Sequence, residues 1–159
     1  MYRDIHQLRD VAGISDRPLN IDIGIVKGAK PSLYGLPKTL DSVGSAVVLF
    51  LSERCATCRS LAAGFEREFP SNLWVVLDSA KTGTFSDFWN SYGLTNKESD
   101  NRVVMDLNNK IAKSIGLDTT PVGFRIENGV FTNATTIPSL RYLISILPKP
   151  LQLRREKRL

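Results

Sequence analysis

The chain has two cysteines, Cys55 and Cys58, and their separation by two residues suits a reactive thiol pair. They form a C-x-x-C pattern, in which two thiols lie close enough to bond with each other. A thiolate at the first position could attack a disulfide of another molecule, and the second thiol could then attack the mixed disulfide and release that molecule. The spacing therefore predicts thiol–disulfide exchange, with Cys55 attacking and Cys58 resolving.

The segments around this pair predict where it lies in a fold. Residues 46–51 are apolar at every position and rich in β-branched side chains, which is typical of a central strand buried on both faces. Helical spacing follows directly, with apolar side chains at i, i+4 and i+8 before a proline: Leu61, Phe65, Phe69 and Pro70. Cys55 is thus expected at a strand-to-helix junction, where the free N–H groups and the helix dipole favour a thiolate.

The rest of the chain alternates between strand-like and helix-like segments. Further strands are predicted at residues 20–26, 73–77, 103–105, 122–126 and 130–131. Further helices are predicted at residues 84–92, 108–115 and 138–147, and residues 27–44 are predicted to be mainly loop. The dipeptide Asn128-Gly129 favours a type I′ hairpin turn. This order predicts an α/β fold, a mixed sheet flanked by helices on both faces of a single domain.

Length and charge set further bounds. A chain of 159 residues can bury one full core, and we place it at residues 20–147, between an N-terminal arm (1–19) and a basic C-terminal tail (148–159). The tail holds five basic residues and one acidic residue, so it carries +4 of the net charge of +5. The nearly neutral body argues against a nucleic-acid partner, and the tail is either a solvated end or a contact with an anionic membrane.

Two segments carry a resemblance to a known family. Residues 47–59 resemble the active-site segment of the thioredoxin superfamily, and residues 115–121, Ile-Gly-Leu-Asp-Thr-Thr-Pro, resemble its Gly-Val-x-x-Thr-Pro segment. Residues 78–101 and 105–108 are similar to the membrane-tethered TlpA and MauD-like branch. The resemblance implies a thioredoxin-like fold over residues 20–147. It also implies a cis-proline at Pro121 that faces the cysteines, and a substrate groove at Thr120 and Pro121.

The same resemblance bears on cofactors, partners and location. It implies no organic cofactor, protein thiols and disulfides as substrates, and a redox-recycling partner protein. The longest apolar run, residues 46–51, is far shorter than the about 20 residues that cross a bilayer, and the start of the chain lacks the pattern of a secretory signal. Tethered relatives imply work outside the cytoplasm, associated with a membrane through an anchor missing from this sequence. A chain that truly begins at Met1 would instead be cytoplasmic.

The sequence also departs from the family pattern. Thioredoxins have Trp directly before the first cysteine, where this chain has Arg54, and they bury Asp six residues before it, where this chain has Leu49. Another group must then handle the proton of Cys58, and Glu53 is the nearest carboxylate in the sequence. Glu53, Arg54 and Arg59 are candidate modulators, the arginines by stabilising a thiolate, although all three could be ordinary solvated side chains.

Other roles for the cysteines fit the sequence less well. A structural disulfide between them would close a very short loop and add little stability. A zinc site needs about four ligands, and the chain offers two cysteines and the distant His6, so we predict no metal. Peroxiredoxin chemistry would need a Pro-x-x-x-Thr/Ser-x-x-Cys arrangement before Cys55. Ser52 fits this arrangement, but Val48 stands at the position of its proline, so this chemistry is disfavoured. The alternative function is a redox-inert thioredoxin-like module that binds a protein partner.

Overall fold

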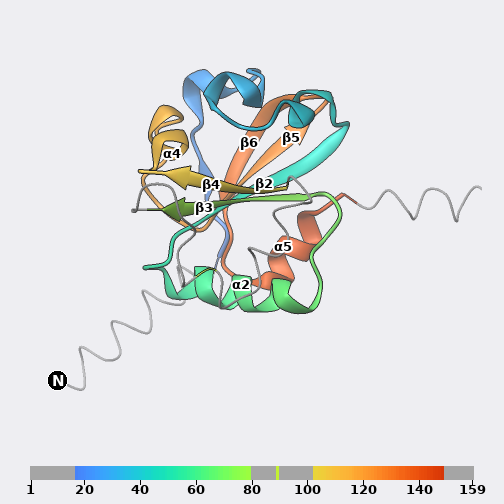
Figure 1. The fold of residues 1–159 in the computed structure, drawn as a ribbon. Coiled ribbons are helices and arrows are strands. Elements are labelled where there is room, and N and C mark those ends of the chain that lie inside the picture. Colours follow the sequence, from blue (N-terminus) through green and yellow to red (C-terminus); the bar gives the residue numbers. More distant parts are fainter. Residues whose placement is uncertain (1–16, 80–88, 90–101, 149–159) are drawn as a thin grey trace, which may run out of the picture.

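The fold is centred on a six-stranded sheet (Figure 1). A computed structural model of the chain describes residues 17–79, 89 and 102–148. The strands lie in the order β1-β6-β5-β2-β3-β4. Their bounds are β1 (Asn20–Ile21), β2 (Ser45–Leu51), β3 (Leu73–Ser79), β4 (Val103–Leu107), β5 (Val122–Glu127) and β6 (Val130–Thr136). β2, β3 and β4 are parallel neighbours, whereas β5 is antiparallel to β2 and β6, and β1 is antiparallel to β6.

Helices cover both faces of this sheet, which confirms the predicted fold class. α2 (Ala56–Arg67) and α5 (Leu140–Ile146) lie on one face. The other face is covered by α4 (Lys110–Ser114) and by three short 3-10 helices, η1 (Gly24–Val26), η2 (Pro31–Tyr34) and η3 (Lys38–Ser42). Each face has its own apolar core, so the central strands are buried on both sides.

β2 shows how one strand serves both cores. Its side chains alternate between the faces, as the two-residue period of a strand requires. Val47, Leu49 and Leu51 pack in the core under α2 and α5. Ala46, Val48 and Phe50 pack in the core under α4 and the 3-10 helices. This explains why the run is apolar at every position, and it confirms the predicted central strand.

Most predicted elements are confirmed, with small shifts of their ends. β3 continues to Ser79 and β6 to Thr136, both beyond the predicted strands. The predicted arm and tail lie almost wholly outside the described residues, and His6 lies there too. The predicted helix at residues 84–92 also falls outside them except at Trp89, which is helical. In the described part of the chain, no helix reaches the length and apolarity needed to cross a bilayer.

The predicted strand at residues 20–26 is wrong beyond Ile21. The Asp22 carboxylate accepts the N–H of Gly24 at 3.0 Å, and Gly24 adopts φ +50°. This local bond turns the chain into η1, because an aspartate side chain offers the backbone an alternative to strand pairing. The predicted loop at residues 27–44 likewise contains η2 and η3.

The β5–β6 hairpin is confirmed, and its turn packs tightly against η3. Asn128 and Gly129 both have positive φ, at 52° and 79°, as a type I′ turn requires. A Cβ added at Gly129 would lie 2.0 Å from the carbonyl oxygen of Asp41. Only glycine fits this position, since any side chain would overlap the backbone of η3.

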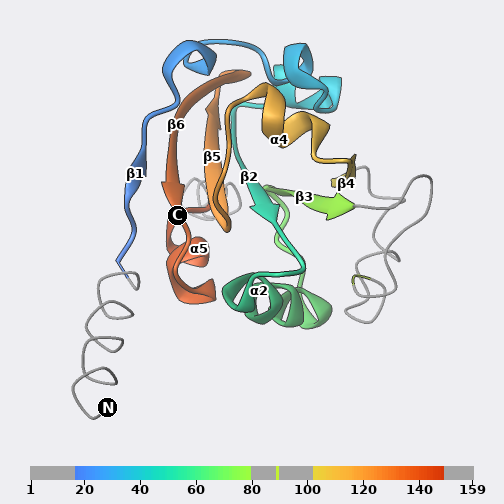
Figure 2. The same ribbon diagram turned by 90° about the vertical axis from the view of Figure 1, so that its left-hand side faces the viewer.

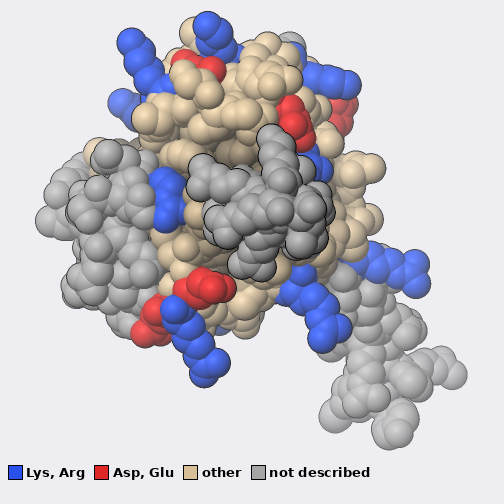
Figure 3. All heavy atoms as spheres, turned by 90° about the vertical axis from the view of Figure 1, so that its right-hand side faces the viewer, with Lys and Arg blue, Asp and Glu red and all other residues tan. Residues whose placement is uncertain are grey.

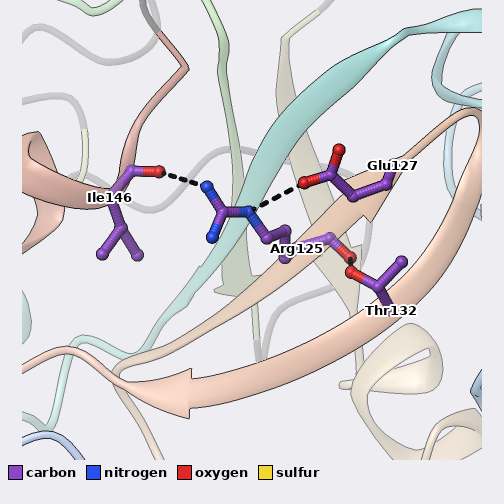
Figure 4. A network of polar contacts seen from close by, with 4 residues as sticks. All are labelled: Arg125, Glu127, Thr132 and Ile146. Carbon is purple, nitrogen blue, oxygen red and sulfur yellow. Dashed lines mark hydrogen bonds and ion pairs between the residues drawn. The ribbon is translucent and has the colours of Figure 1, made fainter.

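A polar network joins α5 to the sheet (Figure 4). The Arg125 guanidinium on β5 donates to the carbonyl oxygen of Ile146 at 3.1 Å and lies 3.2 Å from a carboxylate oxygen of Glu127. The Thr132 hydroxyl on β6 donates to the carbonyl oxygen of Arg125 at 3.2 Å. A cation at the last turn of a helix satisfies its free carbonyls and opposes its dipole. The final helix is therefore held by polar as well as apolar contacts.

Candidate active site

A short loop connects β2 to α2 (Figure 2), and Cys55, at the end of that loop, is the N-cap of α2. Its backbone is extended, at φ −102° and ψ 120°, and its Sγ accepts the N–H of Cys58 at 3.1 Å. The sulfur thus takes the place that a serine or aspartate oxygen takes in an ordinary N-cap. The predicted position at a strand-to-helix junction is confirmed, and helix N–H groups at such a position stabilise negative charge.

Cys58 lies one turn deeper and differs from Cys55 in its surroundings. Both cysteines are free thiols, but Cys55 is half-buried and Cys58 is 0% exposed. Burial raises the pKa of the Cys58 thiol to about 12, and the hydrogen bond and charge of Cys55 act in the same direction. The N–H of Ser52 donates to the Cys58 Sγ at 3.3 Å and opposes that shift of the pKa. Cys58 is therefore protonated at neutral pH.

The segment before β5 completes the surroundings of the pair. The Cys55 thiol donates to the carbonyl oxygen of Thr120 at 3.6 Å, across 65 positions of sequence. The Thr120–Pro121 peptide bond is cis, and Pro121 is buried. The antiparallel pairing of β5 with β2 explains the proximity, because the start of β5 lies at the end of β2. The structure thus brings Thr120 to Cys55, and the predicted cis-proline, Pro121, follows it directly in the chain.

The three candidate modulators lie around the pair in different ways. Arg54 is exposed and lines a cavity together with Cys55. Arg59 is exposed and donates to the carbonyl oxygen of Glu53 at 3.2 Å. This bond connects the first turn of α2 to the loop after β2. The proposed effects of Glu53, Arg54 and Arg59 on the cysteines stay predictions.

Asp78, at the end of β3, is a member of the site that the motifs did not identify. Its carboxylate accepts the hydroxyl of Ser52 at 3.0 Å and the N–H of Glu53 at 3.1 Å. Leu51 pairs with Leu77, so Ser52, the first residue after β2, lies beside Asp78, which is still part of β3. The sequence does contain a signal for this residue, because Asp78 directly follows the predicted strand at residues 73–77. If that strand is parallel to the strand before the cysteines, both end at the same edge of the sheet, which would place Asp78 near the pair.

An open cavity of about 460 Å³ lies at this edge of the sheet. It is lined by the ends of β2, β3 and β4, by α4 and by the segment before β5. Its lining includes neutral, basic and acidic polar side chains: Ser52, Thr120, Arg54, Lys113, Asp78 and Asp106. Cys55 opens into it. Among the described residues, no three His, Cys, Asp or Glu side chains gather to hold a metal ion. On the face seen in Figure 3, basic side chains are interspersed with acidic and uncharged ones.

Similarity to known proteins is found among solved structures, at low sequence identity and low TM-score. No protein-family model matches the chain, and no curated protein matches it. A secreted disulfide oxidoreductase of Mycobacterium tuberculosis, homologous to Escherichia coli DsbE, is 12% identical with a TM-score of 0.41, over 60% of this chain and 71% of that one.

Two further solved structures show the same degree of likeness. The thioredoxin domain of a thiol-disulfide oxidoreductase from Bacteroides vulgatus is 11% identical with a TM-score of 0.43, over 69% of this chain and 83% of that one. A thiol-disulfide isomerase from Corynebacterium glutamicum is 14% identical with a TM-score of 0.41, over 84% and 97%. The fold class of this chain rests on its own strand order and helix placement.

Proposed function

We propose that the chain is a thiol–disulfide oxidoreductase that exchanges disulfides with protein partners through Cys55 and Cys58. The asymmetry of the pair carries this proposal. Cys55 is half-buried and opens into a cavity, with its sulfur at the N-terminus of a helix. Cys58 is fully buried one turn behind it. One sulfur is thus accessible to a substrate and the other only to the first sulfur.

The exchange proceeds in two steps, attack by Cys55 and resolution by Cys58. The Cys55 thiolate attacks one sulfur of a substrate disulfide, and the other substrate sulfur leaves as a thiolate, which takes up a proton. Cys58 then loses its proton and attacks the Cys55 sulfur of the mixed disulfide, and the second substrate sulfur leaves. Two electrons pass to the substrate and the Cys55–Cys58 disulfide forms. The reverse sequence oxidises a dithiol partner.

The order of the steps follows from the electrostatics of the pair. Burial and the neighbouring Cys55 sulfur both raise the pKa of Cys58, so it does not compete as the first nucleophile. Once Cys55 is part of a mixed disulfide, it carries no negative charge. One cause of the raised pKa then disappears, which favours ionisation of Cys58 at the moment when its attack is needed.

The substrate groove is proposed at Thr120 and Pro121. The Thr120 carbonyl lies 3.6 Å from the Cys55 Sγ, so the backbone of a cysteine bonded to Cys55 would lie beside it. A carbonyl in that place can accept an N–H of an extended substrate segment. A redox-recycling partner would restore the pair after each turnover. A location outside the cytoplasm, with a membrane tether, stays a prediction from the family resemblance.

Reduction of insulin by dithiothreitol tests the proposal. The chain should accelerate the precipitation of the insulin B chain, and Cys55→Ser should lose the acceleration completely while staying folded, because serine is itself a good N-cap. Cys58→Ser should accumulate a mixed disulfide, visible by mass spectrometry under non-reducing conditions. Absence of turnover in every redox buffer would contradict the proposal and favour a redox-inert binding module.

A further inference from the structure

The residue that organises the end of β2 comes from the neighbouring strand. The position at which the thioredoxin pattern places a buried aspartate is Leu49, which is fully buried in the apolar core and has no proton to exchange. The carboxylate bonded to the segment before the cysteines is that of Asp78. It accepts the Ser52 hydroxyl at 3.0 Å with one oxygen and the Glu53 N–H at 3.1 Å with the other.

Asp78 is itself held on its backbone side. Its carbonyl oxygen accepts the indole N–H of Trp89 at 3.0 Å, and Trp89 is 0% exposed. Asp78 also pairs with Asp106 in the parallel ladder between β3 and β4. A carboxylate on so constrained a backbone offers its two oxygens in one orientation, which is how a supporting residue fixes the geometry of another.

The segment that Asp78 holds is in contact with the buried cysteine. Ser52 gives its hydroxyl to Asp78 and its backbone N–H to the Cys58 Sγ, at 3.3 Å. Its hydroxyl oxygen also accepts the N–H of Arg54 at 3.3 Å. A donor aimed at a sulfur stabilises the thiolate relative to the thiol. The orientation of this N–H therefore matters for the step in which Cys58 must ionise.

We propose that Asp78 is a positioning residue of the redox pair, which holds Ser52 and Glu53 so that the Ser52 N–H supports ionisation of Cys58 during resolution of the mixed disulfide. This inference rests on the proposed function and goes beyond it. It assigns the residue that compensates for the missing buried carboxylate, and it places that residue on a different strand.

Charge must be separated from geometry in any test, because other charged groups surround Asp78. Those that line the same cavity come from the loop after β2, from β4, from α4 and from the segment before β5: Arg54, Asp106, Lys113 and Asp118. Arg59 on α2 contacts the carbonyl of Glu53. Asp78→Ala removes both hydrogen bonds and the charge, whereas Asp78→Asn removes the charge and keeps a side chain that can bond both partners.

The reduced chain reacted with dithiobis(nitrobenzoate) in a stopped-flow instrument resolves the two steps. Attack by Cys55 releases one nitrobenzoate thiolate, and attack by Cys58 on the mixed disulfide releases the second. We expect Asp78→Ala to slow the second release by about three- to tenfold at neutral pH and to move its pH profile upward, with the first release little changed. Asp78→Asn should restore most of the rate, and Ser52→Ala should show a smaller slowing.

A matched control lies at the opposite end of the sheet. Asp41 on η3 holds Ser32 through the same two kinds of bond, from the N–H at 3.1 Å and from the hydroxyl at 2.5 Å. Asp41→Ala should change the stability of the fold and leave the second release unchanged. Equal slowing by Asp41→Ala, or an unchanged or faster second release in folded Asp78→Ala, would overturn the inference. Should the wild-type chain release only one equivalent, the proposed function itself fails and the inference with it.

Discussion

The two ends of the central sheet are built in different ways. At the hairpin end, the turn of β5 and β6 packs against η3 so closely that the backbone itself makes the contact, at Gly129 and Asp41. At the cysteine end, the strands stop at a cavity of about 460 Å³, and side-chain hydrogen bonds hold the loop after β2. The hairpin end therefore depends on close backbone packing, whereas the cysteine end depends on side-chain hydrogen bonds beside an open cavity.

The largest expected effect belongs to the hairpin end. Gly129→Ala places a Cβ against the Asp41 carbonyl and also strains a backbone with φ +79°. We expect a loss of about 3 kcal/mol in the free energy of unfolding, measured with urea. Exchange activity per folded molecule should be unchanged. Loss of exchange activity per folded molecule in Gly129→Ala would contradict the separation of the two ends.

Asp106 at the cysteine end should rank second. It is 2% exposed, and its carboxylate accepts the N–H groups of Ile111 and Ala112 at 2.7 and 3.0 Å, which anchors the start of α4. Asp106→Ala leaves these donors without their acceptor, and we expect a loss of about 2 to 3 kcal/mol. Because Asp106 lines the cavity into which Cys55 opens, we expect this variant also to alter insulin reduction. Unaltered reduction would show that the cavity wall is purely structural.

Ionisation of Cys58 should make stability depend on pH at the cysteine end. Its pKa is raised from 9.0 to about 12 in the folded chain, so the folded state binds this proton more tightly than the unfolded state. The resulting stability is complete below pH 9 and is lost as the pH rises toward 12. Between pH 8 and pH 10.5 the reduced wild type should lose on the order of 2 kcal/mol more than Cys58→Ala. Urea unfolding at both pH values measures this difference. An equal loss of unfolding free energy in the two proteins would contradict the raised pKa of Cys58.

The smallest effect is expected at the Arg125 network. Arg125 and Glu127 form an ion pair with side chains 38% and 40% exposed, and solvent weakens such a pair. Glu127→Ala should cost less than about 1 kcal/mol, whereas Arg125→Ala also removes the bond to Ile146 and should cost more. Thermal unfolding of both variants measures the difference. Equal losses would mean that the docking of α5 owes little to that bond.

Local sequence predicted the elements whose signals are local. The uniformly apolar β2 run, the helical spacing after Cys55 and the Asn128-Gly129 turn were all interpreted correctly, because each depends on burial or backbone preference within a few residues. The prediction failed at Asp22 and Gly24, where alternating isoleucines suggested a longer strand. There one side-chain bond to a backbone N–H outweighed the two-residue pattern.

The pairing of Cys55 with Cys58, their place before a helix and the α/β class could all be predicted from the sequence, since they follow from spacing and periodicity. Which residues surround the pair depends on the tertiary structure, although the family resemblance already pointed to Thr120 and Pro121. Asp78 meets Ser52, and Thr120 meets Cys55, because parallel and antiparallel pairing with β2 brings distant strand ends to one edge. The raised pKa of Cys58 likewise comes from burial, a property of the packed molecule that no short segment contains.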